Sequence, residues 1–512
     1  MPATPATALT WPDYVVLAAS LGVLLFIGFR LTGEQRDTVD FFLARRRVPS
    51  WAACLSFLAT EISAVTIISV PATAYSENWE YAQFFVGSSL AKWAVAFVFI
   101  PAFYRYEVTT IYQFLLHRFG QRSQVTASIF FFITRLAGSG ARLTMTALAV
   151  GYLMGWSLVP TIVVFSVVSI IYIATGGVKA VVWTNVFQAL MFLAAGAVTL
   201  AFLVSQIDGG IGAMVRLAGD TGHLNVVNWG PSLGAPDFWR RIFTNPNIVW
   251  VAVLNGLIGS MAAFGTDHDL MQRLLTVETR RESQWTLSLT PLGTLVTLII
   301  YLGLGAGLFA YYTQHPAPAL ARADEILPHF VRSVMPEVLR GFMLAAIVLS
   351  SIDSPLGSLA ASFVTNIYRP LIVRGRSERH YLRVSRIAVL GFGIVLGVLA
   401  WGFAFVPGQM LWTVFKIAGV TSGSLLGVFL LGLLTSRRIA DGANVAAMIA
   451  MAVINLILLL LIETKHLALG WSWLVIVGTA GTIVLALLLS LPSRAHARTG
   501  VIPGQRPASS RR

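Results

Sequence analysis

Cysteine is almost absent from this sequence: Cys54 is the only one, so no disulfide can form within the chain. Charged residues are also scarce, at 11% of the 512 residues. The sequence contains no paired nucleophile and base, no cluster of metal-ligating residues and no phosphate-binding loop. Basic residues do not gather in one patch. We therefore expect neither an enzyme nor a protein that binds nucleic acid.

Hydrophobic residues, by contrast, make up 56% of the chain, and its mean hydropathy is +0.76. No soluble domain of this length has such a composition. Because a helix of about 20 apolar residues crosses a bilayer, the apolar runs predict an all-α polytopic membrane protein with about 13 transmembrane helices. The runs lie near residues 13–33, 50–75, 81–104, 124–153, 157–175, 182–206, 247–266, 285–313, 338–368, 385–406, 409–435, 441–462 and 470–491.

The basic residues predict how the chain crosses the cell membrane. If the N-terminus lies outside, 25 of the 36 lysines and arginines fall in inner loops or the C-terminal tail, and 7 fall in outer loops. This bias follows the positive-inside rule and predicts a cytoplasmic C-terminus. The tail, residues 493–512, is rich in Pro, Gly, Ser and Arg, and we expect it to be disordered.

One apolar run, from Leu344 to Pro370, contains an unusual cluster of polar residues. A carboxylate at the middle of a membrane costs about 2.5–3.5 kcal/mol by insertion scales, so we expect a protein-lined or wet ion site here. The cluster consists of Ser350, Ser351, Asp353, Ser354 and Ser358.

Two other spans are interrupted. The second run carries Glu61 and Ser63 in its middle, and the seventh contains Gly256, Gly259 and Gly265. Glycines at this density suit either an unwound helix or a closely packed one. Interrupted helices at corresponding places in two halves are typical of inverted-repeat transporters with a binding site at the midplane. Backbone carbonyls freed at such breaks can coordinate a cation.

The charged residues within spans allow two interpretations. Glu61 is either a functional group or a buried acid that a neighbouring helix satisfies. Arg135 and Arg142 either contact the solute or form an ion pair with an interior acid such as Glu61. We expect Lys92 and Lys416 to extend toward the membrane surface or to form structural ion pairs.

Three motifs together carry a family resemblance. They are Gly176-Gly-x-Lys-Ala-Val-Val-Trp-Thr, then Thr266-Asp-His-Asp followed by Gln272-Arg273, and Ser350-Ser-x-x-Ser-x-x-x-Ser followed by Tyr368-x-Pro. With these motifs, residues 13 to 491 resemble the sodium:solute symporter family, which includes the sodium/glucose, sodium/proline and sodium/sialic acid cotransporters. The resemblance implies a LeuT-type core of two inverted five-helix repeats.

The implied organisation has six parts, and a monomer is the expected functional unit. Residues 1–49 form a leading transmembrane helix and an inner interfacial segment, residues 50–206 the first repeat, 207–246 an irregular outer loop, 247–437 the second repeat, 438–492 two trailing helices, and 493–512 the tail.

The resemblance also implies a sodium site, because the family's shared site uses carbonyls of the first and eighth core helices and two adjacent hydroxyls on the eighth. Oxygen ligands suit a hard cation. The matching positions here are the carbonyls of Ala59, Ile62 and Ile347 and the hydroxyls of Ser350 and Ser351.

Some family members have a further sodium site, built from an aspartate on the fifth core helix and hydroxyls on the eighth. Here the aspartate position holds Asn185, whereas a hydroxyl position holds Asp353, followed by Ser354. Our hypothesis is that the carboxylate has moved across the same site, which keeps a second cation possible. The competing interpretation is that Asp353 takes up a proton.

By family position, several residues face a central solute cavity: Glu61, Ser63, Thr66, Gln83 and Asp267. Sialic-acid-binding members add an arginine from the third core helix, where Arg142 could hold a carboxylate with two hydrogen bonds. Glu61 would repel an anion unless it is paired. We expect a small polar organic solute, with a sugar or a sugar acid such as sialic acid favoured over an amino acid or monocarboxylate.

The resemblance predicts symport by alternating access, in which sodium and solute each raise the affinity for the other. The alternatives are coupling to protons, a non-transporting solute sensor and a sodium channel.

Overall fold

A computed structural model describes residues 9–32, 37–352, 355–406 and 409–490 of the chain. Within these ranges all regular structure is helical. The expected pair Asp353 and Ser354 lies outside the described residues, and so does the tail from residue 491 onward.

The first half of the chain begins with a long apolar helix and ends with a 48-residue helical stretch. Its elements are α1 (Trp11–Thr32), α2 (Thr38–Leu43), η1 (Ala44–Arg46), α3 (Ser50–Glu61), α4 (Ala64–Ser76), α5 (Tyr81–Ala94), η2 (Val95–Phe99), α6 (Ile100–Arg105), α7 (Tyr112–Arg118), α8 (Gln121–Met154) and α9 (Leu158–Ser205).

The second half starts with two short helices, which correct our expectation that residues 207–246 are irregular. Its elements are α10 (Gly210–Asp220), α11 (Phe238–Thr244), α12 (Val249–Gly265), α13 (His268–Leu275), α14 (Arg280–Gln314), η3 (Ala323–Glu325), α15 (Ile326–Ser333), α16 (Leu339–Ile352), α17 (Leu356–Phe363), η4 (Val364–Ile372), α18 (Glu378–Phe403), α19 (Met410–Leu434), α20 (Asp441–Glu463) and α21 (Trp473–Leu489).

Helices occupy all thirteen apolar runs, but fewer are long and apolar enough to cross a membrane by themselves. Among the described residues eight helices meet that requirement, or nine if the bent pair α3 and α4 is one span. The helix α8 is not among them, and it carries Arg135 and Arg142. In α9 the backbone departs from helical geometry at Gly177, with φ of 59°, so the stretch contains two helices joined at a glycine.

The first expected interruption is present. The second lies at Thr266 and Asp267, between α12 and α13, whereas Gly256 and Gly259 lie within the continuous helix α12. Between α3 and α4 the chain bends by 58°. Ser63 adopts an extended conformation there, and its N–H donates to the Thr66 hydroxyl at 3.4 Å. At the second break Asp267 caps α13, because its Oδ1 accepts from the N–H of Asp269 at 2.8 Å. In each case a polar side chain replaces the helical hydrogen bonds that the break removes.

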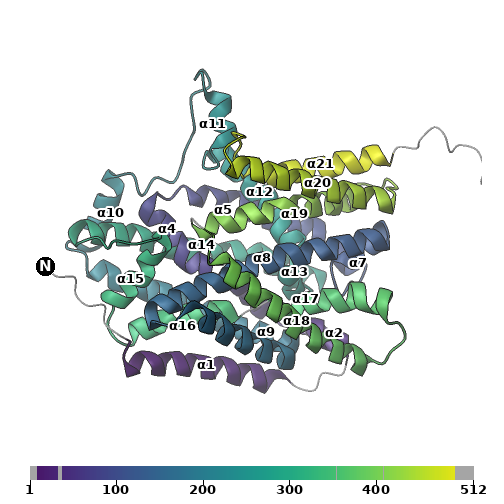
Figure 1. Ribbon diagram of the computed structural model, residues 1–512, viewed down its shortest axis with the longest axis horizontal. Coiled ribbons are helices and arrows are strands. Elements are labelled where there is room, and N and C mark those ends of the chain that lie inside the picture. The colour runs from purple at the N-terminus through teal and green to yellow at the C-terminus, as the bar shows by residue number, and fades with distance from the viewer. Residues whose placement is uncertain (1–8, 33–36, 353–354, 407–408, 491–512) are drawn as a thin grey trace, which may run out of the picture.

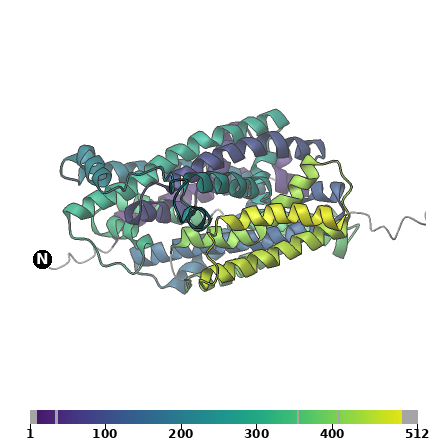
Figure 2. The ribbon, with the colours of Figure 1, turned by 90° about the horizontal axis from the view of Figure 1, so that it is seen from above.

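The helices pack side by side along the long axis of the molecule (Figure 1), with α1 at one side and the neighbouring pair α20 and α21 at the opposite side. Figure 2 shows this terminal pair from above, in front of the remaining helices. The short helix α2 buries Phe41 and Phe42 against Ala361 of α17, so these rings pack within the protein.

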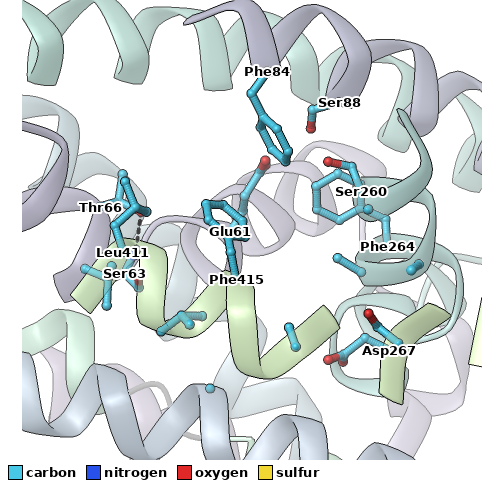
Figure 3. A pocket seen from close by; sticks show the side chains of 18 of the residues that line it. Glu61, Ser63, Thr66, Phe84, Ser88, Ser260, Phe264, Asp267, Leu411 and Phe415 are labelled. Carbon is cyan, nitrogen blue, oxygen red and sulfur yellow. Dashed lines mark hydrogen bonds between the residues drawn. The ribbon is translucent and has the colours of Figure 1, made fainter. Parts of the chain in front are cut away.

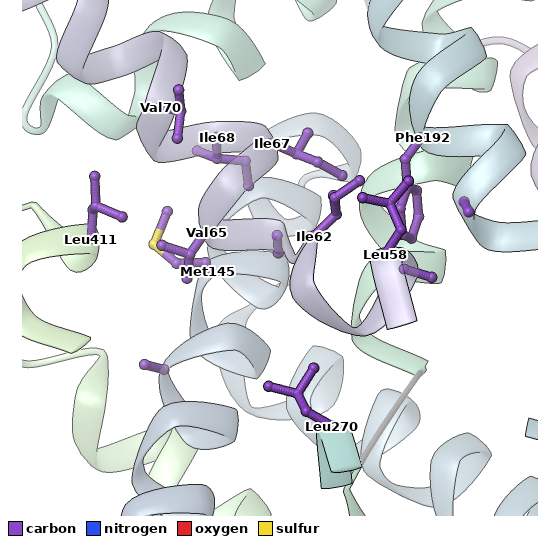
Figure 4. Packing of buried hydrophobic residues seen from close by; sticks show 14 of the residues in the cluster. Leu58, Ile62, Val65, Ile67, Ile68, Val70, Met145, Phe192, Leu270 and Leu411 are labelled. Atoms are coloured by element: carbon purple, nitrogen blue, oxygen red, sulfur yellow. The ribbon is translucent and has the colours of Figure 1, made fainter. Parts of the chain in front are cut away.

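Apolar packing and close helix contacts stabilise the centre. Apolar side chains around the first break, including Leu58, Ile62 and Ile68, are buried in one hydrophobic cluster with Phe192 of α9 (Figure 4). The helices α5 and α12 pack closely at Gly87, where an added Cβ would lie 2.0 Å from the Val253 carbonyl oxygen. Glycine lets the two backbones approach this closely.

Candidate functional site

A cavity of about 310 Å³ lies between the two broken helices. Its wall comes from both breaks and from α5, α8, α14 and α19, with Trp471 contributed by the segment between α20 and α21 (Figure 3). Most of the expected solute-binding residues line it: Glu61, Ser63, Thr66, Arg142 and Asp267. The cavity therefore brings together residues that are more than 200 positions apart in the sequence.

Gln83 is the exception, because it does not line the cavity. Its side chain is buried in the first turn of α5, where Nε2 donates to the Asn247 carbonyl at 2.8 Å and Oε1 accepts from the Asn228 N–H at 3.0 Å. The amide thus holds the segment before α12 against α5. Its family position predicted a cavity residue, but these two hydrogen bonds engage both ends of the amide.

Glu61 forms an ion pair within the cavity wall. Its Oε2 lies 2.7 Å from Nζ of Lys92 on α5 and accepts a hydrogen bond from Thr294 on α14 at 3.0 Å. Lys92 therefore pairs structurally, as one of our two interpretations held. The partner of Glu61 is this lysine, and it is neither of the two arginines that we considered. The second intramembrane lysine, Lys416, also pairs, with Glu463 at 2.8 Å.

The two arginines of α8 both line the cavity but bind different partners. Arg135 bridges Asp267, at 3.4 Å, and Asp269, which Arg273 also contacts at 3.3 Å. Arg142 donates from Nη1 to the Thr60 carbonyl at 3.0 Å, so it holds the last turn of α3. The sequence signalled these arginines by their place in a span, but it did not reveal how they pair.

The implied sodium ligands lie at the first break and on α16, which packs against α4, the helix that follows the break. At the first break the Ser63 N–H, which would bond the Ala59 carbonyl in a continuous helix, donates to Thr66 instead. On α16, which packs against α4, α8 and α9, the Ser350 hydroxyl donates to the Ile347 carbonyl at 2.6 Å. The backbone of Ser351 continues the helix, and its side chain lies outside the described residues.

Asn185 and Gln188 of α9 connect these helices. The Asn185 amide donates to the hydroxyls of Ser56 and Thr60 on α3, each at 3.2 Å. Gln188 donates to the Leu349 carbonyl on α16 at 3.2 Å. Both side chains are fully buried, and their amide oxygens have no hydrogen-bond partner within the described part of the chain. Such oxygens are suitable ligands for a hard cation. The sequence did not single out Ser56 or Gln188 for this site.

The geometry is thus that of a polar cavity at two helix breaks, with oxygen-rich helices beside the first. The model of the "Sodium:solute symporter family" matches residues 41–451, which is most of the chain. The chain belongs to the sodium:solute symporter family.

Two relatives illustrate the range of this family. The sodium/sialic acid symporter SiaT of Proteus mirabilis is 30% identical over 448 residues, which cover 86% of this chain and 88% of SiaT. The human sodium-coupled monocarboxylate transporter 1 is 27% identical over 461 residues, which cover 87% of this chain and 73% of that protein.

Solved structures show the same likeness. A substrate-bound, outward-open structure of a Na⁺-coupled sialic acid symporter matches with a TM-score of 0.80 and 26% identity, over 94% of this chain and 98% of that one. The closed conformation of Mhp1, a nucleobase-cation-symport-1 family transporter, matches with a TM-score of 0.54 and 16% identity, over 88% and 93% of the two chains, which shows similarity of fold alone.

As a family member the chain is a multi-pass membrane protein that transports a solute by sodium-coupled symport, and it is not an enzyme. Sodium is its coupling ion and an organic solute is its cargo.

Proposed function

We propose that this symporter takes up a small polar organic solute that carries a carboxylate and hydroxyl groups, with a sugar acid such as sialic acid favoured. The charged groups of the cavity support this. Arg135 and Arg142 both line it, and a guanidinium group can hold a carboxylate with two hydrogen bonds. Lys92 neutralises Glu61, so this acid would not repel an anionic solute.

Polar groups on the wall suit the rest of such a solute. Hydroxyls of Ser88 and Ser260 lie on the wall near Glu61 (Figure 3). Ser63 and Thr66 also line the cavity, but their hydroxyls accept from each other's backbone N–H in a capping box. A sugar acid would bind the wall hydroxyls with its own hydroxyls, whereas a short monocarboxylate offers fewer of them, at a cost in affinity. Amino acids and monocarboxylates are the second choice, and a human relative is a sodium-coupled monocarboxylate transporter.

For the sodium ion we propose the carbonyls of Ala59, Ile62 and Ile347 with the hydroxyls of Ser350 and Ser351. Support comes from the break at Ile62, which frees carbonyls, and from the position of α16 beside α4. A second cation between Asn185 and the 353–354 segment remains a hypothesis, supported by the buried Asn185 amide oxygen. The alternative is that Asp353 takes up a proton instead of binding a second cation.

The mechanism that we propose is alternating access by a core of two inverted five-helix repeats, residues 50–206 and 247–437, within a 13-helix monomer. The leading helix belongs to residues 1–49, residues 207–246 form the outer loop, and the trailing helices occupy residues 438–492. The N-terminus lies outside and the tail, 493–512, in the cytoplasm. Sodium entering from outside ties the first and eighth core helices together and so favours solute binding.

The test is the thermal stability of the purified protein in sodium and in potassium, with sialic acids, sugars, amino acids and short monocarboxylates added to each. A ligand that binds only the native state raises its stability. We expect a sugar acid to stabilise the protein only in sodium. A response to uncharged sugars alone would contradict the charge argument, whereas stabilisation by short monocarboxylates alone would select the second choice.

A further inference from the structure

The ammonium group of Lys92 has the surroundings of a bound ion. The side chain is 1% exposed, and Nζ lies 2.7 Å from Oε2 of Glu61 and 2.8 Å from the Thr294 hydroxyl. The rings of Phe264 and Phe57 lie 5.1 and 6.0 Å from the same nitrogen. Two oxygens and two aromatic rings thus bind one positive charge.

These groups come from elements that the transport cycle would move. Glu61 and Phe57 belong to α3 at the first break, and Phe264 is the residue before the last one of α12, at the second break. Thr294 belongs to α14 and Lys92 itself to α5. A single cation therefore connects both broken helices with two further helices of the cavity wall, and Glu61 also faces the cavity (Figure 3).

We propose that Glu61 and Thr294, with the two phenylalanine rings, form a monovalent-cation site whose resident cation is the Lys92 ammonium. A carboxylate, a hydroxyl and ring faces bind a small hard or alkylammonium cation as well as they bind a lysine. Because the ammonium is covalently attached, it neutralises Glu61 throughout the cycle and is never released. No sodium ion is coupled at this place.

Lys92→Ala removes three carbons and the ammonium group, and it leaves the Glu61 carboxylate without its cationic partner. The site then becomes available to a soluble cation. Sodium and n-propylammonium are the two probes, because n-propylammonium restores both the ammonium and the three missing carbons.

The experiment measures the melting temperature of the purified full chain against sodium chloride and against n-propylammonium chloride, with choline chloride keeping the ionic strength constant. For the wild type we expect one sodium transition and no response to n-propylammonium. Lys92→Ala should melt lower without these cations, gain a second sodium transition at a different midpoint, and recover with n-propylammonium.

Two control variants separate this site from other effects. Glu61→Gln combined with Lys92→Ala removes the carboxylate and should abolish both new responses while retaining the wild-type sodium transition. Lys416→Ala removes a lysine whose pair with Glu463 is partly exposed, at 29% and 48%, and should behave like the wild type. Responses in Lys92→Ala identical to those of the wild type would overturn the proposal. So would a Lys92→Ala protein that does not fold even in high sodium or n-propylammonium, because these cations should replace the ammonium.

Discussion

Carboxylates inside the bundle are stabilised by neighbouring cations. Glu61 is neutralised by Lys92, and Asp269 lies between Arg135 and Arg273. A buried charge without such a partner would cost several kcal/mol. Asp267 is held less closely, at 3.4 Å from Arg135, and it faces the cavity. The arginines of α8 are therefore the residues through which an anionic solute would be recognised.

Replacing one of these arginines tests that recognition. We expect Arg142→Gln to weaken solute binding at saturating sodium by about 10- to 150-fold, since hydrogen bonds to charged groups contribute about 1.5–3 kcal/mol. Isothermal titration calorimetry with the solute that stabilises the protein measures this. Arg216→Gln, on the exposed surface of α10, serves as the control and should change nothing. Equal affinities of the two variants would remove Arg142 from the solute site.

Among the elements, α16 depends on a helix that the family match does not include. Asp13 of α1 accepts hydrogen bonds from the N–H groups of Val338, at 3.2 Å, and Gly341, at 3.0 Å, and it pairs with Arg340. The acid therefore caps α16 from another helix, at the opposite end from Ser350. The matched region begins at residue 41, so α1 stabilises the proposed sodium-binding helix from outside it.

We predict that Asp13→Asn destabilises the protein by about 3–5 kcal/mol, because it removes the negative charge that the buried Arg340 pairs with. Thermal unfolding in detergent checks this value. The matched variant is Asp237→Asn, whose pair with Arg241 has side chains 41% and 60% exposed and should contribute only about 0–1 kcal/mol. If the two variants have the same melting temperature, Asp13 does not stabilise α16.

The breaks could be predicted from the sequence and most cavity residues from the family resemblance, but their partners could not. Polar residues inside apolar runs mark a break because the signal is local, whereas Gly256 and Gly259 lie within a continuous helix. The pairs Glu61 with Lys92 and Arg135 with Asp267 join residues 31 and 132 positions apart, and only packing decides such pairs. The partners of Gln83 were not predicted for the same reason, since no pattern around Asn228 or Asn247 points to α5.

At the scale of the whole molecule, the broken helices, the cavity and the ion pairs are packed against one another. Two broken helices enclose the cavity, α16 and α9 lie beside the first break, and fixed ion pairs connect the breaks to α5 and α8. Sodium bound between the first and eighth core helices would change the packing of the same helices that line the solute cavity. Reciprocal coupling between ion and solute follows from this arrangement.

The most direct test of this account is solute accumulation in proteoliposomes that contain the purified protein, under a sodium gradient directed inward. N-acetylneuraminic acid is the first labelled probe, and the other solutes of the stability panel follow. We predict accumulation above the external concentration, its loss when the sodium gradient is collapsed, and a higher sodium requirement in Ser350→Ala. Accumulation driven by a proton gradient without sodium, or simple equilibration of every solute, would contradict sodium-coupled symport through these residues.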